Sequence, residues 1–242
     1  MRGGVAGASQ RDGRAVGATA APGADGGRYR ARADAILEKS GIKGGFVVHV
    51  GAEDGGLTAA LRAGESYVVQ GLVEDRKKAR SIRERLRSRG TYGNVSVVSW
   101  DGERLPYAKD IVDLLVVTKA RGLSEADIRR VLAPRGMALL RHDGAWNKLT
   151  ARWPEGMDEW THYLHGPDNN AVARDTQVGP PRRLRWVSGP PYARSHEFNS
   201  SMGGMVSSAG RLFYMWDEGP IGVVDERPPS KWQRIARDAF NG

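Results

Sequence analysis

Residues 46–61, FVVHVGAEDGGLTAAL, constrain the fold more than any other stretch of the chain, because three patterns follow one another there. The apolar run at its start predicts a strand that is buried on both faces. Gly51, Gly55 and Gly56 then predict a tight turn, and the apolar residues after them share one face of a helix. Ligands of open α/β sheets bind at such turns, so we expect free N–H groups at the helix start to face a ligand.

Strand and helix patterns alternate along the chain as far as residue 142. Helical periodicity is found at 29–40, at 75–89 and from Ser124 onward, where Asp127 completes an N-terminal capping signal. Further apolar strand patterns lie at 66–73, 94–100, 111–117 and 137–140. This alternation predicts an α/β fold with a doubly wound, Rossmann-like and mostly parallel sheet.

Composition shifts divide the chain into four predicted parts. Residues 1–27 are rich in Gly, Ala and Arg and are predicted to be disordered, whereas 28–143 form the α/β domain. A linker rich in Trp, Pro and Asn follows at 144–182, and 183–242 are predicted to be all-β. The strand candidates of this last part are 183–188, 205–208, 211–216 and 232–238.

Composition also limits the chemistry and the partners. The chain has no cysteine, which excludes disulfides, thiolate metal sites and a cysteine nucleophile, and no apolar run is long enough to span a membrane. The net charge of +9 makes nucleic acid a candidate partner through the basic helix at 76–89. We favour a solvated face for this helix instead, because no aromatic residues interleave its cations.

The region from residue 46 to residue 140 resembles the core of class I S-adenosylmethionine-dependent methyltransferases. The resemblance rests on the glycine turn, on WDG at 100–102, on LPY at 105–107 and on RVLAPRGMALL at 130–140. It implies S-adenosylmethionine as cofactor and an unknown methyl acceptor, with no catalytic residue assigned. The cofactor-binding residues that it implies are Gly51, Glu53, Gly55, Glu74 and Asp101.

Several departures from the family pattern fall on the cofactor site. His49 stands where the family has an acidic residue, and we expect it to be a hydrogen-bonded strand histidine. Glu53 replaces the middle glycine of the turn, and Val73 occupies the place of the carboxylate that binds the ribose, with Glu74 one residue late. Loss of that carboxylate would weaken binding about tenfold to a hundredfold. The expected function is therefore a methyltransferase-like protein with a degenerate cofactor site.

A dinucleotide is the competing ligand of the glycine turn. Gly51, Glu53 and Gly56 fall at the three positions of a G-x-G-x-x-G pattern. Glu53 argues against this reading, because a carboxylate would meet the pyrophosphate with both bulk and like charge.

Residues 158–190 and 208–219 resemble the opening of a PQQ-binding-like β-propeller, a domain found behind methyltransferase-like segments in large multidomain bacterial proteins such as those of planctomycetes. A propeller has roughly four to eight blades, and this sequence supplies about one. We therefore expect an N-terminal fragment and no bound PQQ. The alternative function that follows is a non-catalytic binding or scaffold role.

The segment DEWTHYLH also permits a metal site. His162 and His165 are three residues apart and follow Asp158 and Glu159, but a hydrogen-bonded structural role is the favoured interpretation. Lack of a signal peptide predicts a cytoplasmic protein, whereas the propeller resemblance implies export to the periplasm.

Overall fold

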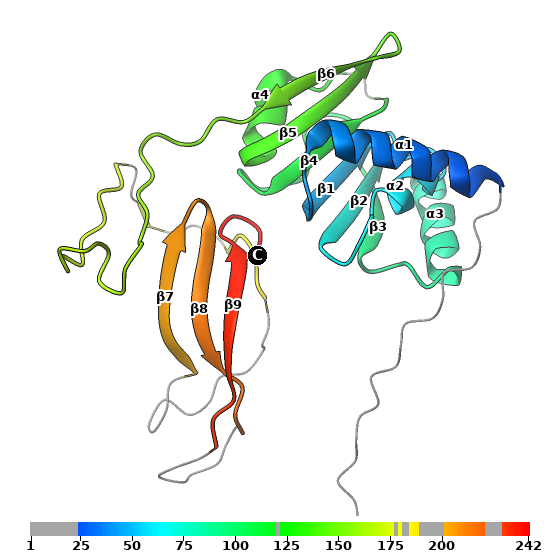
Figure 1. Cartoon of the computed structure of the whole chain (residues 1–242). Coiled ribbons are helices and arrows are strands. Elements are labelled where there is room, and N and C mark those ends of the chain that lie inside the picture. The colour runs from blue at the N-terminus through cyan, green and yellow to red at the C-terminus, as the bar shows by residue number, and fades with distance from the viewer. Residues whose placement is uncertain (1–23, 120–121, 177–178, 181–183, 189–200, 221–228) are drawn as a thin grey trace, which may run out of the picture.

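The computed structural model contains one six-stranded sheet and one three-stranded sheet (Figure 1). It describes residues 24–119, 122–176, 179–180, 184–188, 201–220 and 229–242. The predicted disorder of residues 1–23 lies outside the described residues. Within the described residues, no helix is long and apolar enough to cross a membrane.

The larger sheet has the strand order β3-β2-β1-β4-β5-β6. Its strands are β1 (Gly45–Val50), β2 (Tyr67–Val73), β3 (Val95–Ser99), β4 (Val112–Val117), β5 (Leu132–His142) and β6 (Ala145–Thr150). The first five are parallel, and β6 runs antiparallel to β5. The order reverses between β1 and β4, so the predicted doubly wound, Rossmann-like fold is confirmed for this part.

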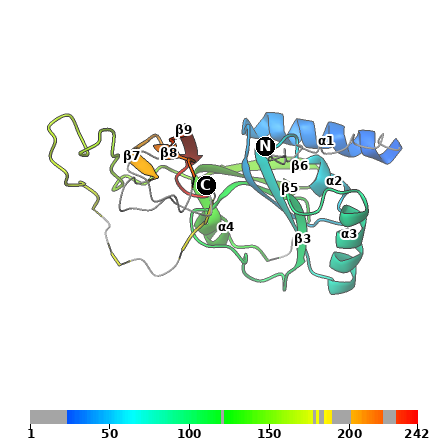
Figure 2. The ribbon, with the colours of Figure 1, turned by 90° about the horizontal axis from the view of Figure 1, so that it is seen from below.

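Helices cover both faces of this sheet (Figure 2). The helices are α1 (Ala24–Ser40), α2 (Gly56–Ala60), α3 (Arg76–Ser88) and α4 (Glu125–Val131). Apolar side chains of α1, α2 and α3 pack on one face, and α4 packs on the other together with the loop that contains Trp100 and Leu105. The predicted cap of α4 is confirmed, because the Ser124 side chain accepts a hydrogen bond from the Asp127 N–H.

Two elements differ from the sequence-based boundaries. α1 begins at Ala24, so residues 24–27 are helical although they were predicted to be disordered. Contacts of Tyr29 with the turn after β1 anchor the first half of this helix. Tertiary contacts of this kind can stabilise a helix in residues whose own helix propensity is low. Strand β6 lies in the stretch assigned to the linker. Asp143 and Gly144, both with positive φ, turn the chain from β5 into β6, and an Asp-Gly pair is a strong hairpin signal.

The smaller sheet is an antiparallel meander of three strands. These strands are β7 (Met202–Ser208), β8 (Arg211–Asp217) and β9 (Trp232–Asp238). The strand expected at 183–188 is not formed by residues 184–188, and residue 183 lies outside the described residues. Leu184 and Val187 are each 82% exposed. Their sequence pattern favours a strand, but residues 184–188 pair with no neighbouring strand among the described residues.

The end of the chain joins the smaller sheet to the larger one. The side-chain amide of Asn241 donates to the carbonyl of Ile111 at 3.0 Å and to the carboxylate of Asp113 at 2.5 Å. Near it, the rings of Trp153 and Phe240 meet edge to face at 5.9 Å. These contacts are made at the amino end of β4, opposite the edge where ligands of such sheets bind.

Candidate functional site

The turn after β1 lies at the carboxyl edge of the parallel strands, where ligands bind in this class of fold. Gly51 has a φ of +86°, and a Cβ atom there would lie 2.8 Å from the carbonyl oxygen of Lys119. Gly55 has a φ of +80°, and a Cβ atom there would lie 2.5 Å from Cγ2 of Ile82. Both glycines are therefore needed for the packing of the turn, whatever it binds.

The turn uses several of its backbone donors internally. The N–H groups of Gly51 and Ala52 both donate to the carbonyl of Leu72, at 3.1 and 3.2 Å. The N–H of Gly56, at the start of α2, donates to the carboxylate of Asp54 at 2.8 Å. α2 itself is only five residues long. The expectation that free N–H groups face a ligand at this helix start is thus wrong for Gly56, whereas Gly51 and Ala52 lie before α2 and extend the hydrogen bonding of β1 to β2.

His49 is buried beneath the turn and holds two hydroxyl groups. Its Nδ1 lies 2.8 Å from Oγ1 of Thr58, and its Nε2 lies 2.9 Å from Oγ1 of Thr118. Burial, together with the charge of Arg32, lowers the pKa of His49 to about 3. The ring is therefore neutral at pH 7, and the expectation of a hydrogen-bonded strand histidine is confirmed.

Side chains from α1 and from the end of β4 close over the turn. The hydroxyl of Tyr29 donates to Asp54, and its ring lies where a side chain at Gly56 would be. On the other side, Lys119 pairs with Glu53 at 3.4 Å, and both side chains are exposed. Although burial of Asp54 opposes it, the hydrogen bonds from Tyr29 and from the Gly56 N–H hold the pKa of this carboxyl below its usual value.

The end of β2 presents one exposed carboxylate to the same edge. Val73, at the position that the family resemblance gives to the ribose carboxylate, is only 6% exposed and packs in the core on the side of α3. The strand ends there, so Glu74 lies beyond it, 3.6 Å from where a Cβ atom of Gly102 would be. Asp75 is engaged elsewhere, because it caps α3 by accepting from two backbone N–H groups of the first turn.

The last of the implied cofactor residues follows β3. Asp101 is exposed and accepts the N–H of Glu103 at 3.1 Å. Its neighbour Gly102 lies beside Glu74, so the loops after β2 and β3 meet at this edge of the sheet. All five residues of the implied set therefore follow the carboxyl ends of β1, β2 and β3, as the order of the strands predicts.

Sequence reasoning did not single out Tyr29, Asp54 or Thr118, although they shape the turn. Tyr29 reaches Asp54 from 25 residues away, and Thr118 reaches His49 from 69 residues away. No motif spacing links residues so distant in sequence. Among these residues, only Asp54 had a local sequence signal. An aspartate two residues before a glycine is typical of a short turn in which the carboxylate accepts the glycine N–H.

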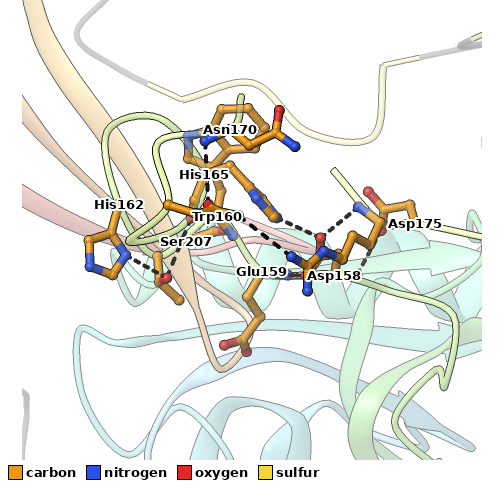
Figure 3. A network of polar contacts seen from close by, with 11 residues as sticks. Asp158, Glu159, Trp160, His162, His165, Asn170, Asp175 and Ser207 are labelled. Carbon is orange, nitrogen blue, oxygen red and sulfur yellow. Dashed lines mark hydrogen bonds and ion pairs between the residues drawn. The ribbon is translucent and has the colours of Figure 1, made fainter. Parts of the chain in front are cut away.

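The segment with the possible metal ligands instead forms a hydrogen-bonded strap on the smaller sheet (Figure 3). Nε2 of His165 lies 2.7 Å from the carboxylate of Asp158, which also accepts the backbone N–H of Arg174 at 2.7 Å. The Arg174 N–H, His165 and a neighbouring N–H together lower the pKa of Asp158 to about 2. Among the described residues, no group of three or more His, Asp or Glu is arranged to hold a metal ion.

The strap holds the hairpin between β7 and β8. The backbone N–H of Ser207 donates to the carbonyl of Trp160 at 2.7 Å, and the Ser207 hydroxyl accepts the Trp160 N–H at 2.9 Å. The carboxylate of Glu159 accepts the N–H of Ala209 at 2.5 Å. The polar side chains of this segment are thus used to fasten one edge of the smaller sheet.

Comparisons with known proteins give matches for the α/β part. No family model matches the chain, and no curated protein does. A putative S-adenosyl-L-methionine-dependent methyltransferase from Methanococcus maripaludis is 20% identical with a TM-score of 0.41, covering 46% of this chain and 54% of its own. A putative sarcosine dimethylglycine methyltransferase from Galdieria sulphuraria is 19% identical with a TM-score of 0.42, covering 47% and 46%.

A third solved structure, the [4+2]-cyclase SpnF, is 21% identical with a TM-score of 0.42, covering 48% of this chain and 47% of its own. The chain thus spans about half the length of each of these structures. Likeness of this degree assigns neither a cofactor nor a reaction. The strand order and the helices on both faces establish a Rossmann-like sheet.

Proposed function

We propose that residues 24–150 form a methyltransferase-like domain with a degenerate cofactor site, and that this domain has a non-catalytic binding or scaffold role. The observation that carries the proposal is the internal use of the turn's donors. Leu72 and Asp54 accept three N–H groups of the turn, among them the Gly56 N–H at the start of α2. A ligand would have to replace these hydrogen bonds. Each buried N–H group that it left without an acceptor would lower the stability of the complex.

The side chains around the turn fit the methionine part of S-adenosylmethionine poorly. An ammonium group needs an anionic or carbonyl acceptor, yet the position of the family's acidic residue holds the neutral ring of His49, buried between two threonines. Of the two carboxylates on the turn, Glu53 pairs with Lys119 at 3.4 Å, and Asp54 accepts hydrogen bonds from Tyr29 and from the Gly56 N–H. Tyr29 lies over the helix start. This poor fit supports a domain that keeps the fold without turnover.

A second candidate function is S-adenosylmethionine-dependent transfer to an unknown acceptor. Glu74 favours it, because this exposed carboxylate lies past the end of β2, next to the loop that carries Asp101. A carboxylate at this place could accept hydrogen bonds from the two ribose hydroxyls. The candidate requires the turn to open, so that Tyr29 leaves Asp54 and Lys119 leaves Glu53.

The scaffold role extends to the smaller sheet. Its three antiparallel strands are fewer than the four strands of a propeller blade. We propose that β7, β8 and β9 belong to such a blade, as the resemblance of their sequence to PQQ-binding-like propellers implies. The α/β domain would then serve as the support to which the blade is attached.

Calorimetric titration with S-adenosylmethionine and S-adenosylhomocysteine tests the proposal. We expect no saturable heat up to about 1 mM ligand, which corresponds to binding weaker than about −4 kcal/mol. Glu74→Gln is the matched variant, because it removes the ribose acceptor while keeping the shape of an exposed side chain. Saturable binding by the unmodified chain that weakens at least about tenfold in Glu74→Gln would overturn the proposal of a degenerate cofactor site and favour the second candidate.

A further inference from the structure

α3 carries more positive charge than its packing uses. Its buried stripe is formed by Ala79, Ile82 and Leu86, which dock on the larger sheet. The other positions of the helix are cationic or serine, apart from Glu84. Its cations, with the one at the residue after the helix, are Arg76, Lys77, Lys78, Arg80, Arg83, Arg85, Arg87 and Arg89.

Half of these cations are engaged within the domain. Their contacts are Arg83 to the carbonyl of Val97 at 2.6 Å, Arg85 to the carbonyl of Asp54 at 3.0 Å, Arg80 to Glu84 at 3.4 Å, and Arg87 over the ring of Tyr92 at 4.5 Å. Within the part of the chain that the structure describes, Arg76, Lys77, Lys78 and Arg89 form no ion pair. These four side chains are exposed and available to an anion.

The position of three of these cations is unfavourable for the helix itself. Arg76, Lys77 and Lys78 fill the first turn of α3, and the N-cap Asp75 offsets part of their charge, because this carboxylate interacts with Lys77 and Lys78. Cations at this end oppose the helix macrodipole, and like charges four residues apart, such as Arg76 and Arg80, repel each other. The packing of α3 needs none of this charge. An anionic partner that covers the first turn would reduce what remains of both penalties.

α1 extends the cationic surface. Arg28, Arg30 and Arg32 are exposed on its first half, where Arg30 pairs with Asp34 at 3.1 Å. Tyr29 ties this half to Asp54, whose carbonyl binds Arg85 of α3. Both views place α3 and the start of α1 at the end of the α/β domain that is remote from β7, β8 and β9 (Figures 1 and 2). The surface is therefore open on the side away from the smaller sheet.

We propose that α3 and the first half of α1 bind the phosphate backbone of nucleic acid without reading its bases. The exposed positions of α3 hold no apolar side chain, whereas helices that lie on membranes insert an apolar face. Arginine forms paired hydrogen bonds with phosphate oxygens, and α3 is about 20 Å long, enough to follow several phosphates. Arg87 lies over one face of the ring of Tyr92, an aromatic residue beside α3, so this face is not open to stacking on bases.

Fluorescence anisotropy with a labelled 20-nucleotide DNA, single-stranded and as a duplex, tests this surface in the full chain. Four phosphate contacts to the duplex predict a loss of affinity of about a hundredfold between 50 and 200 mM NaCl. The triple variant Arg76→Gln, Lys77→Gln, Lys78→Gln should weaken binding at least about tenfold at 50 mM salt and lower the salt slope by about two to three. Circular dichroism should show its helix content unchanged.

The matched control is Lys43→Gln, Lys148→Gln, Arg152→Gln, which removes the same charge at exposed positions outside α1 and α3. It should change affinity by less than about twofold, because contacts beyond the Debye length are screened. Equal losses in both triple variants, or salt-independent binding, would overturn the proposal. So would absence of oligonucleotide binding, or binding to phosphatidylglycerol vesicles that the oligonucleotide does not displace.

Discussion

The two sheets of this chain differ in how their faces are covered. In the six-stranded sheet, helices lie on both sides, and side chains of β1, β4 and β5 such as Val48, Leu115 and Leu139 are fully buried. In the three-stranded sheet, Phe213 and Met215 of β8 are each 40% exposed. A parallel sheet needs helices on both faces, whereas an antiparallel sheet can leave one face in water. This chain contains one sheet of each kind.

The exposed face of the smaller sheet is apolar and hollowed. A groove of about 670 Å³ is lined by Tyr163, Met205, Phe213, Met215 and Trp232, among others. The contacts that hold this sheet in place include the strap at 158–165, Asn241 and the edge-to-face rings of Trp153 and Phe240. The α/β domain is therefore stabilised by a large core of its own, whereas the smaller sheet depends on a few polar and aromatic contacts.

The largest expected effect tests the difference in burial. Leu139→Ala should lower the free energy of unfolding by about 2–5 kcal/mol, because it opens a cavity in a fully buried site. Phe213→Ala should cost about 1–2 kcal/mol, since 40% of this residue is in water already. Urea titrations of both variants measure the two values. Similar losses in both would mean that the smaller sheet has a core of its own.

A smaller effect concerns Asp113, which joins the two sheets. Burial raises its pKa to about 6, although hydrogen bonds from the Phe46 N–H and Asn241 oppose the shift. The folded protein therefore binds this proton more tightly than the unfolded chain. Its contribution to stability is present below pH 4 and is lost as the pH rises to about 6, by up to about 3 kcal/mol.

Asp113→Asn should remove this loss and leave stability flatter between pH 4 and pH 6. Thermal unfolding at several pH values would show it, with Glu65→Gln at an exposed position as the control. An unchanged pH profile in Asp113→Asn would mean that the carboxylate is in water, and that Asn241 does not fasten the smaller sheet to β4.

The smallest expected effect concerns the strap. His165→Ala removes a buried partner of Asp158 and should cost about 1–2 kcal/mol. Hydrogen exchange should then increase in β7 and β8, while the amides of β1 and β4 keep their protection. Loss of protection throughout the larger sheet would show that the two regions unfold as one unit.

Most of the larger fold was predictable from local patterns. The valines before Gly51 and the stripe of Ala79, Ile82 and Leu86 are periodic signals, and each matches a buried element. Gly51 and Gly55 were recognised as turn residues because they follow the apolar strand pattern. β6 was missed because its side chains are largely exposed, so the Asp143–Gly144 turn was the only strong signal.

The state of the candidate site followed from contacts that no local pattern contains. His49 is neutral because Thr58, Thr118 and the surrounding core enclose it, and the donors of the turn are used because Leu72 and Asp54 lie within reach. Periodicity reports which face of an element is buried, since neighbours in sequence share that face. It does not report which distant side chain completes a hydrogen bond, because that depends on how the elements pack in three dimensions.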